Sequence, residues 1–240
     1  MKSKCKFPYF WNMNRVVFLL LFIPTMLLSQ TNFEKGIQLM GSGKTEQARI
    51  AFENVLKENP SHIKSLEFLG DIAGQNKNWD KAIVYYKKIK QLQPNNAEYY
   101  YKYGGALGMK AKTVNKFKAL GMIDEIKASF EKAVALDSKH KESRWALVML
   151  YLELPGIIGG SEIKAVAYSN ELMRLSPFEG YLSKGYIEEY FGRNKKSEIN
   201  YLKALEINNS KVAFQKLYNL YTYKMKNSEK AQQLKEQFEK

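Results

Sequence analysis

The sequence of 240 residues is poor in cysteine and histidine, with one Cys and two His. A disulfide framework needs paired cysteines, and a zinc ribbon or similar cluster needs about four Cys or His ligands, so both classes are excluded. Six Pro and 15 Gly exclude collagen-like and low-complexity chains, and an apolar content of 45% excludes intrinsic disorder. The sequence therefore predicts a globular protein without a metal site or cofactor.

Arginine is also scarce, because only five of the 38 basic residues are Arg, against 24 acidic residues and a net charge of +14. Nucleic-acid sites favour Arg with aromatic side chains on one face. Here the lysines are spread along the whole chain, so no nucleic-acid partner is predicted. The excess of Lys indicates either a solvated surface or an attraction to an anionic surface of the cell envelope.

Acidic residues are absent from the first 33 positions, where Lys2, Lys4, Lys6 and Arg15 precede the apolar run 16–28 and Ser29. A basic lead, a short apolar run and a small residue are typical of a secretory signal peptide. As a helix the run would be about 20 Å long, shorter than the roughly 30 Å core of a bilayer. We expect residues 1–29 to be a signal peptide, with an uncleaved membrane anchor as the alternative.

Cleavage of such a signal would leave a mature chain that begins near Gln30. It would keep +10 of the net charge of +14 and would contain no Cys, since Cys5 would be removed. Met13 also precedes a compact signal pattern, so the leader could start at Met1 or at Met13. The predicted location is outside the cytoplasm, in the periplasm or cell envelope, with membrane attachment if cleavage does not occur.

The strongest pattern in the chain is an internal repeat of 34 residues. Small, apolar and Pro residues recur at this interval: Gly36, Gly70 and Gly104; Leu39, Ala73 and Leu107; Ala48 and Ala82; Phe52 and Tyr86; Val55 and Ile89; Pro60 and Pro94. Within residues 63–94 the apolar positions follow helical spacing, with a turn and capping residue at Asn78. Gly70 and Ala82 would allow two antiparallel helices to approach closely. Asn95, with Glu98 three residues later, predicts the cap of the next helix.

These residues resemble the tetratricopeptide repeat, a helix–turn–helix unit of 34 residues. The matching positions in the second unit are Leu66, Leu69, Gly70, Ala73, Ala82, Tyr86 and Pro94. Less complete copies cover residues 30–240, including a divergent helix pair at 211–238 that would cap the stack. The resemblance implies an all-α fold, an α-solenoid of about five to six such repeats, that presents a groove to a protein or peptide partner.

Two insertions interrupt the repeat, near residues 108–121 and 154–161. The first carries Lys110, Lys112, Lys116 and Lys118 without an acidic residue, and indicates either an extended helix pair with a solvated basic face or a docking surface for an anionic partner. The second contains Gly159, Gly160 and Ser161, which could form a tight turn capped by Ser161 or hold an anion at a helix start. Together the insertions resemble a subgroup of small exported bacterial tetratricopeptide proteins with a Pro-Gly-Ile-x-Gly-Gly turn.

The first helix of each repeat supplies the predicted groove. If its apolar stripe faces the neighbouring helices, the opposite face carries Lys64, Glu67, Asp71, Glu98, Tyr101, Glu142, Trp145 and Met149. Tyr101, Trp145 and Met149 could anchor apolar side chains of a partner, and the four carboxylates would favour Lys or Arg in that partner. Alternatively, Trp145 and Met149 belong to the core between repeats.

No pattern indicates an enzyme. Gly41-Ser42-Gly43-Lys44-Thr45 resembles the end of a phosphate-binding loop, but Gln38 stands where the motif needs Gly, and the segment falls in an inter-helix turn. No nucleotide is therefore predicted as a ligand. His62 and His140 each lie in a link after a repeat and are interpreted as solvated. The predicted function is a protein-binding scaffold in the bacterial cell envelope, with docking on a membrane surface through the Lys-rich insertion as the alternative.

Overall fold

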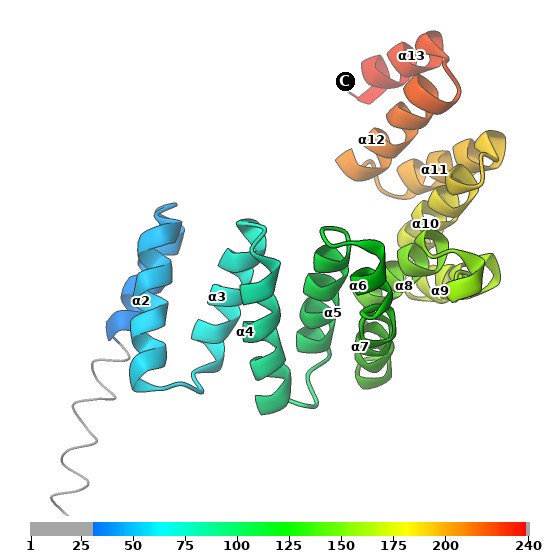
Figure 1. The fold of residues 1–240 in the computed structure, drawn as a ribbon. Coiled ribbons are helices and arrows are strands. Elements are labelled where there is room, and N and C mark those ends of the chain that lie inside the picture. The colour runs from blue at the N-terminus through cyan, green and yellow to red at the C-terminus, as the bar shows by residue number, and fades with distance from the viewer. Residues whose placement is uncertain (1–30, 239–240) are drawn as a thin grey trace, which may run out of the picture. The chain divides into compact units, whose positions relative to one another are not determined.

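The computed structural model describes residues 31–238, in which all regular secondary structure is helical (Figure 1). The predicted signal peptide or anchor at residues 1–29 lies outside the described residues. Among residues 31–238, no helix combines the length and the apolar character needed to cross a bilayer. The chain divides into two compact units, the first ending at Pro94 and the second beginning at Asn95.

The first unit contains two helix pairs, coloured blue to cyan in Figure 1. Its helices are residues 31–41, α2 (Thr45–Glu58), α3 (Ile63–Gln75) and α4 (Trp79–Leu92). Helix α3 contacts both α2 and α4. Phe52 of α2 and Leu69 of α3 are buried in one apolar cluster, with the rings of Phe52 and Phe68 stacked 4.8 Å apart. The 34-residue repeat therefore corresponds to one helix pair, as predicted.

Close approach of the two helices in a pair depends on glycine. A Cβ added to Gly70 would lie 2.5 Å from Cε1 of Tyr86, and one added to Gly36 would lie 2.4 Å from Cε1 of Phe52. Real carbon atoms do not approach this closely, so the aromatic ring occupies the volume that a side chain would need. Ala82 is completely buried in α4, as its position in the repeat predicted.

The second unit contains four further helix pairs, in which α5 packs on α7, α8 on α9, α10 on α11 and α12 on α13. Their bounds are α5 (Ala97–Ala111), α7 (Ile123–Leu136), α8 (Lys141–Glu153), α9 (Glu162–Leu175), α10 (Pro177–Tyr190), α11 (Asn194–Ile207), α12 (Lys211–Asn219) and α13 (Ser228–Phe238). A π-helical turn, η2 (Leu220–Lys224), joins the last two. With the two pairs of the first unit, the described residues form six pairs, and the fold class is the predicted all-α solenoid.

Residues 108–121 contain the end of α5 and a separate short helix that contacts it. Helix α5 ends at Ala111, a separate short helix α6 (Lys116–Leu120) follows, and α7 begins at Ile123. Asn115 starts α6 by accepting a hydrogen bond from the Lys118 backbone N–H. Because the Asn side-chain oxygen accepts a hydrogen bond from a backbone N–H of the first turn, Asn favours the start of a new helix at this position.

Side-chain caps begin most of the helices and correct two sequence predictions. Helix α5 is capped by Asn96 rather than Asn95, through a hydrogen bond from the Glu98 N–H to Asn96 Oδ1 of 3.0 Å. His62 and His140, expected in solvated links, cap α3 and α8 by accepting a backbone N–H at Nδ1. His140 is only 7% exposed, since Tyr101 of α5 packs against its ring.

The two glycine-containing segments that the sequence singled out, 41–45 and 154–161, both form turns between helices. Residues 42–44 form the turn before α2, with Gly43 at a φ of +71° and Lys44 N–H bonded to Leu39 O. In residues 154–161 a short 3-10 helix, η1 (Gly156–Ile158), precedes Gly159 at a φ of +102°. Ser161 then caps α9 by accepting the Lys164 N–H, which is the tight-turn alternative of the two that the sequence left open.

Candidate partner-binding pocket

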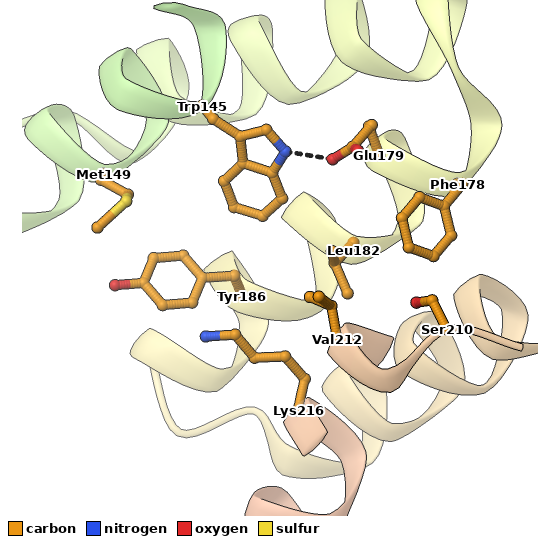
Figure 2. A pocket seen from close by; sticks show the side chains of 9 residues that line it. All are labelled: Trp145, Met149, Phe178, Glu179, Leu182, Tyr186, Ser210, Val212 and Lys216. Atoms are coloured by element: carbon orange, nitrogen blue, oxygen red, sulfur yellow. Dashed lines mark hydrogen bonds between the residues drawn. The ribbon is translucent and has the colours of Figure 1, made fainter. Parts of the chain in front are cut away.

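An apolar pocket lies within the second unit, between the first helices of three successive pairs. Its volume is about 430 Å³, and Figure 2 shows its lining on α8, on α10, and on α12 with the link before it. The lining residues are Trp145, Met149, Phe178, Glu179, Leu182, Tyr186, Ser210, Val212 and Lys216. Trp145 and Met149, two residues of the predicted groove, are thus brought together on the wall contributed by α8.

Trp145 is held in position at the pocket by α10. Its Nε1 donates a hydrogen bond of 2.5 Å to Glu179 Oε2, drawn as the dashed line in Figure 2. Its ring meets that of Tyr186 edge-on, with centroids 6.2 Å apart. The indole is therefore oriented before any partner binds, so little side-chain entropy would be lost on binding.

Much of the remaining lining is apolar and accessible. Val212 of α12 is 57% exposed and Met149 of α8 is 38% exposed, while Leu182 of α10 is buried. Lys216 places its ammonium 4.7 Å from the centre of the Tyr186 ring, in a cation–π contact. Apolar walls with a few polar groups at the edge are typical of sites that take an apolar side chain from a partner.

Three other residues of the predicted groove surround His140 instead of lining the pocket. His140 Nε2 lies 3.3 Å from Glu98 Oε2, and its Nδ1 lies 3.6 Å from Glu142 Oε2. Tyr101 packs between the His140 and Phe130 rings. Burial, and next the charges of Glu98 and Glu142, raise the pKa of the Tyr101 hydroxyl. This cluster joins α5 to α8.

The groove residues of the first unit are engaged with neighbouring side chains. Lys64 and Glu67 form an ion pair of 2.9 Å on α3. Asp71 accepts a hydrogen bond of 2.5 Å from the Tyr86 hydroxyl, which joins α3 to α4. The four carboxylates that were expected to attract Lys or Arg thus all lie beside a partner within the chain, since Glu142, like Glu98, lies next to His140.

The predicted basic docking surface is only partly a free surface. Lys112 forms a 2.9 Å ion pair with Glu153 at the end of α8, and Lys110 is half-buried. Lys116 and Lys118, on α6, are exposed. The exposed positive charge of this insertion is therefore concentrated on the short helix.

Sequence reasoning missed the pocket residues on α10 and α12. The second insertion shifts the 34-residue register after α8, so positions on α10 no longer align with those of α8 by simple addition. Counting from the helix caps restores the alignment, because Ser176 and Ser210 cap α10 and α12 as His140 caps α8. Phe178 and Val212 then fall at the same helical position as Glu142, on the groove face.

Within the described residues, no group of three or more His, Cys, Asp or Glu side chains is placed to bind a metal ion. The pocket has an oriented aromatic wall and an open apolar space, which suit the noncovalent binding of an apolar group.

The fold and one repeat match known proteins. Residues 63–96 match the family model of the tetratricopeptide repeat. A stretch of 65 residues is 37% identical to the peroxisomal targeting signal receptor of Pichia angusta, which corresponds to 27% of this chain and 11% of that relative. The chain thus spans about a tenth of the length of the curated relatives it matches.

Solved structures with this fold cover most of the chain. A thermophilic tetratricopeptide-repeat protein of Thermus thermophilus aligns with a TM-score of 0.64 at 18% identity, over 81% of this chain and 99% of that one. YrrB, a tetratricopeptide-repeat protein with an unusual peptide-binding site, aligns with a TM-score of 0.54 at 16% identity, over 77% and 89% of the two chains. This chain has the tetratricopeptide-repeat fold over most of its length.

Proposed function

We propose that this protein is a non-enzymatic scaffold that binds a peptide or helical segment of a protein partner in the bacterial cell envelope. The pocket formed by α8, α10 and α12 takes a large apolar side chain of that segment. The observation that carries the proposal is the convergence of three first helices on one open apolar space of about 430 Å³. This volume falls in the usual range for ligand pockets, about 300–1,000 Å³.

The contacts around the pocket support an apolar anchor rather than a charged one. Trp145 and Tyr186 are aromatic residues of the kind that dominate binding energy at interfaces. Glu179 already accepts the indole N–H, and the Lys216 ammonium lies over the Tyr186 ring. Since both ionic groups have partners, burial of an apolar side chain against the walls is the main source of affinity.

Selection from a random peptide library on the full chain tests the proposal. Enriched peptides should share a large apolar residue, and Val212→Glu should weaken their binding at least about tenfold, because a carboxylate would be desolvated in an apolar space. Val84→Glu on α4 is the matched control, since Val84 is 64% exposed and lies outside the pocket. Equal affinity in both variants would place peptide binding elsewhere.

Action in the cell envelope rests on the signal pattern of residues 1–29. The mature protein is then expected to fractionate outside the cytoplasm and to begin near Gln30. N-terminal sequencing of the protein from its native host, after fractionation, checks this. A cytosolic protein that retains Met1 or Met13 would contradict it.

A further inference from the structure

The two insertions meet at one edge of the second unit. Lys112 follows directly after α5 and Glu153 is the last residue of α8, and their side chains form an ion pair of 2.9 Å. Helix α6 follows Lys112 along the chain, and η1 follows Glu153. Both inserted segments therefore leave the helix array from neighbouring points.

Each insertion exposes a bulky apolar side chain almost completely. Phe117 on α6 is 88% exposed, Ile157 on η1 is 97% exposed, and Ile163 in the first turn of α9 is 83% exposed. Single exposed apolar residues are common on proteins, but three of this size on α6, η1 and the start of α9 are not a typical solvated surface.

The backbone fixes the exposure of Ile157. Gly159 has a φ of +102°, and a Cβ on Gly160 would lie 1.8 Å from the Leu154 carbonyl oxygen. The turn thus requires both glycines, and it holds η1 in a conformation that directs Ile157 into solvent. An isoleucine held in solvent in this way does not contribute to the core of its own chain and is available to an interaction partner.

The charges next to Phe117 are positive, whereas Ile163 lies between Glu162 and Lys164. Lys116 and Lys118 flank Phe117 and are exposed, and residues 108–121 contain no acidic residue. Apolar side chains beside lysines are typical of segments that lie at the boundary between headgroups and acyl chains of an anionic bilayer. A fluid bilayer accepts separate projecting side chains without a complementary pocket, whereas a protein partner would need one for each.

We propose that this edge docks on a membrane surface that contains anionic lipids, with Phe117, Ile157 and Ile163 inserted at the headgroup level. The lysines of α6 contact the lipid headgroups. Membrane docking is a second interaction surface, separate from the peptide pocket, and it would position the pocket close to the membrane.

Hydrogen–deuterium exchange of the full chain with lipid vesicles tests the proposal. Vesicles of phosphatidylcholine with about 30% phosphatidylserine should slow exchange in peptides covering 113–121 and 155–163, and about 1 M salt should reduce the effect. Vesicles of phosphatidylcholine alone should produce little slowing. The readout is local, so it does not depend on what residues 1–30 contribute to vesicle binding.

Two pairs of matched variants complete the experiment. Phe117→Ser with Ile157→Ser should lower the protection of both peptides at least about fivefold, whereas Ile199→Ser with Ile207→Ser, at exposed positions on α11, should not. Lys116→Glu with Lys118→Glu should have a similar effect, and Lys132→Glu with Lys139→Glu should leave protection near the wild-type value. Absence of protection in both peptides on anionic vesicles, or equal protection in test and control variants, would overturn the proposal.

Discussion

Glycine and aromatic residues form the basic contact of the repeat. Gly70 lies against the Tyr86 ring, and Gly104 and Gly185 lie against the rings of Phe130 and Tyr201 in the same way. The hydroxyl of Tyr86 donates a hydrogen bond to Asp71 of α3, which opposes movement of the ring away from that helix. The contact determines how closely the two helices of a pair approach each other.

Gly70→Ala should therefore destabilise the protein by about 1–3 kcal/mol, because the added methyl group overpacks the Tyr86 ring. Gly105→Ala on α5 is the control, since nothing lies within 4 Å of its added Cβ. There the gain in helix propensity should stabilise the fold by about 0.5–1 kcal/mol. Urea unfolding of both variants measures this, and shifts of the same sign would contradict the packing described for the first unit.

The sequence identified some of these residues and missed others for a physical reason. Gly36, Gly70 and Gly104 recur at the same period, whereas Gly185 follows the second insertion and does not. His140 was misinterpreted because a link residue usually faces solvent, and only the structure shows Tyr101 and Glu98 packed around it. The interactions of side chains from distant segments cannot be derived from spacing along the chain.

At the scale of elements, hydrogen bonds from Tyr to carboxylates join helices of the same pair or of adjacent pairs. The hydroxyls of Tyr103, Tyr201 and Tyr221 each donate to a Glu on another helix of the second unit. Tyr151 of α8 likewise donates to Glu131 of α7 at 3.2 Å. Burial, followed by the charge of Glu131 and this hydrogen bond, raises the pKa of Tyr151 to about 12.

This raised pKa predicts how stability depends on pH. In the unfolded chain Tyr151 loses its proton near pH 10, while the folded state keeps it until about pH 12. The stabilisation is complete below pH 10 and is lost as the pH rises from 10 to 12. Between these values the unfolding free energy of the wild type falls as the pH rises, and Tyr151→Phe should make this fall less steep by up to about 1.4 kcal/mol per pH unit.

Urea unfolding between pH 9 and 11 measures that slope. Glu131→Gln serves as the second variant, because removing the carboxylate charge should lower the Tyr151 pKa and reduce the slope in the same direction. Slopes identical to wild type in both variants would show that Tyr151 does not join α7 to α8 in this way.

Element boundaries were predictable where the repeat is regular and less so at the insertions. The periodicity indicated the helix pairs and the turn at residues 42–44 before the structure showed them. For the Lys-rich insertion the sequence left two alternatives open and did not indicate the separate helix that Asn115 caps.

At the scale of the whole molecule, the sequence predicted the fold class but only part of the candidate site. Trp145 and Met149 both line the pocket from α8, and Trp145 also packs against the core cluster of the second unit, so features of both sequence alternatives are present. Their partners Leu182, Tyr186 and Val212 come from helices after the second insertion. The pocket results from the packing of three successive pairs, which the pattern of any one pair does not contain.

The central claim is that a partner segment places an apolar side chain in this pocket, and methyl NMR of methionine tests it most directly. With methionine labelled at its methyl carbon in the full chain, a peptide from the selection should shift or broaden the Met149 signal, assigned with Met149→Leu. Met109, exposed on α5 and outside the pocket, should keep its position. An unchanged Met149 signal at saturating peptide would contradict the account.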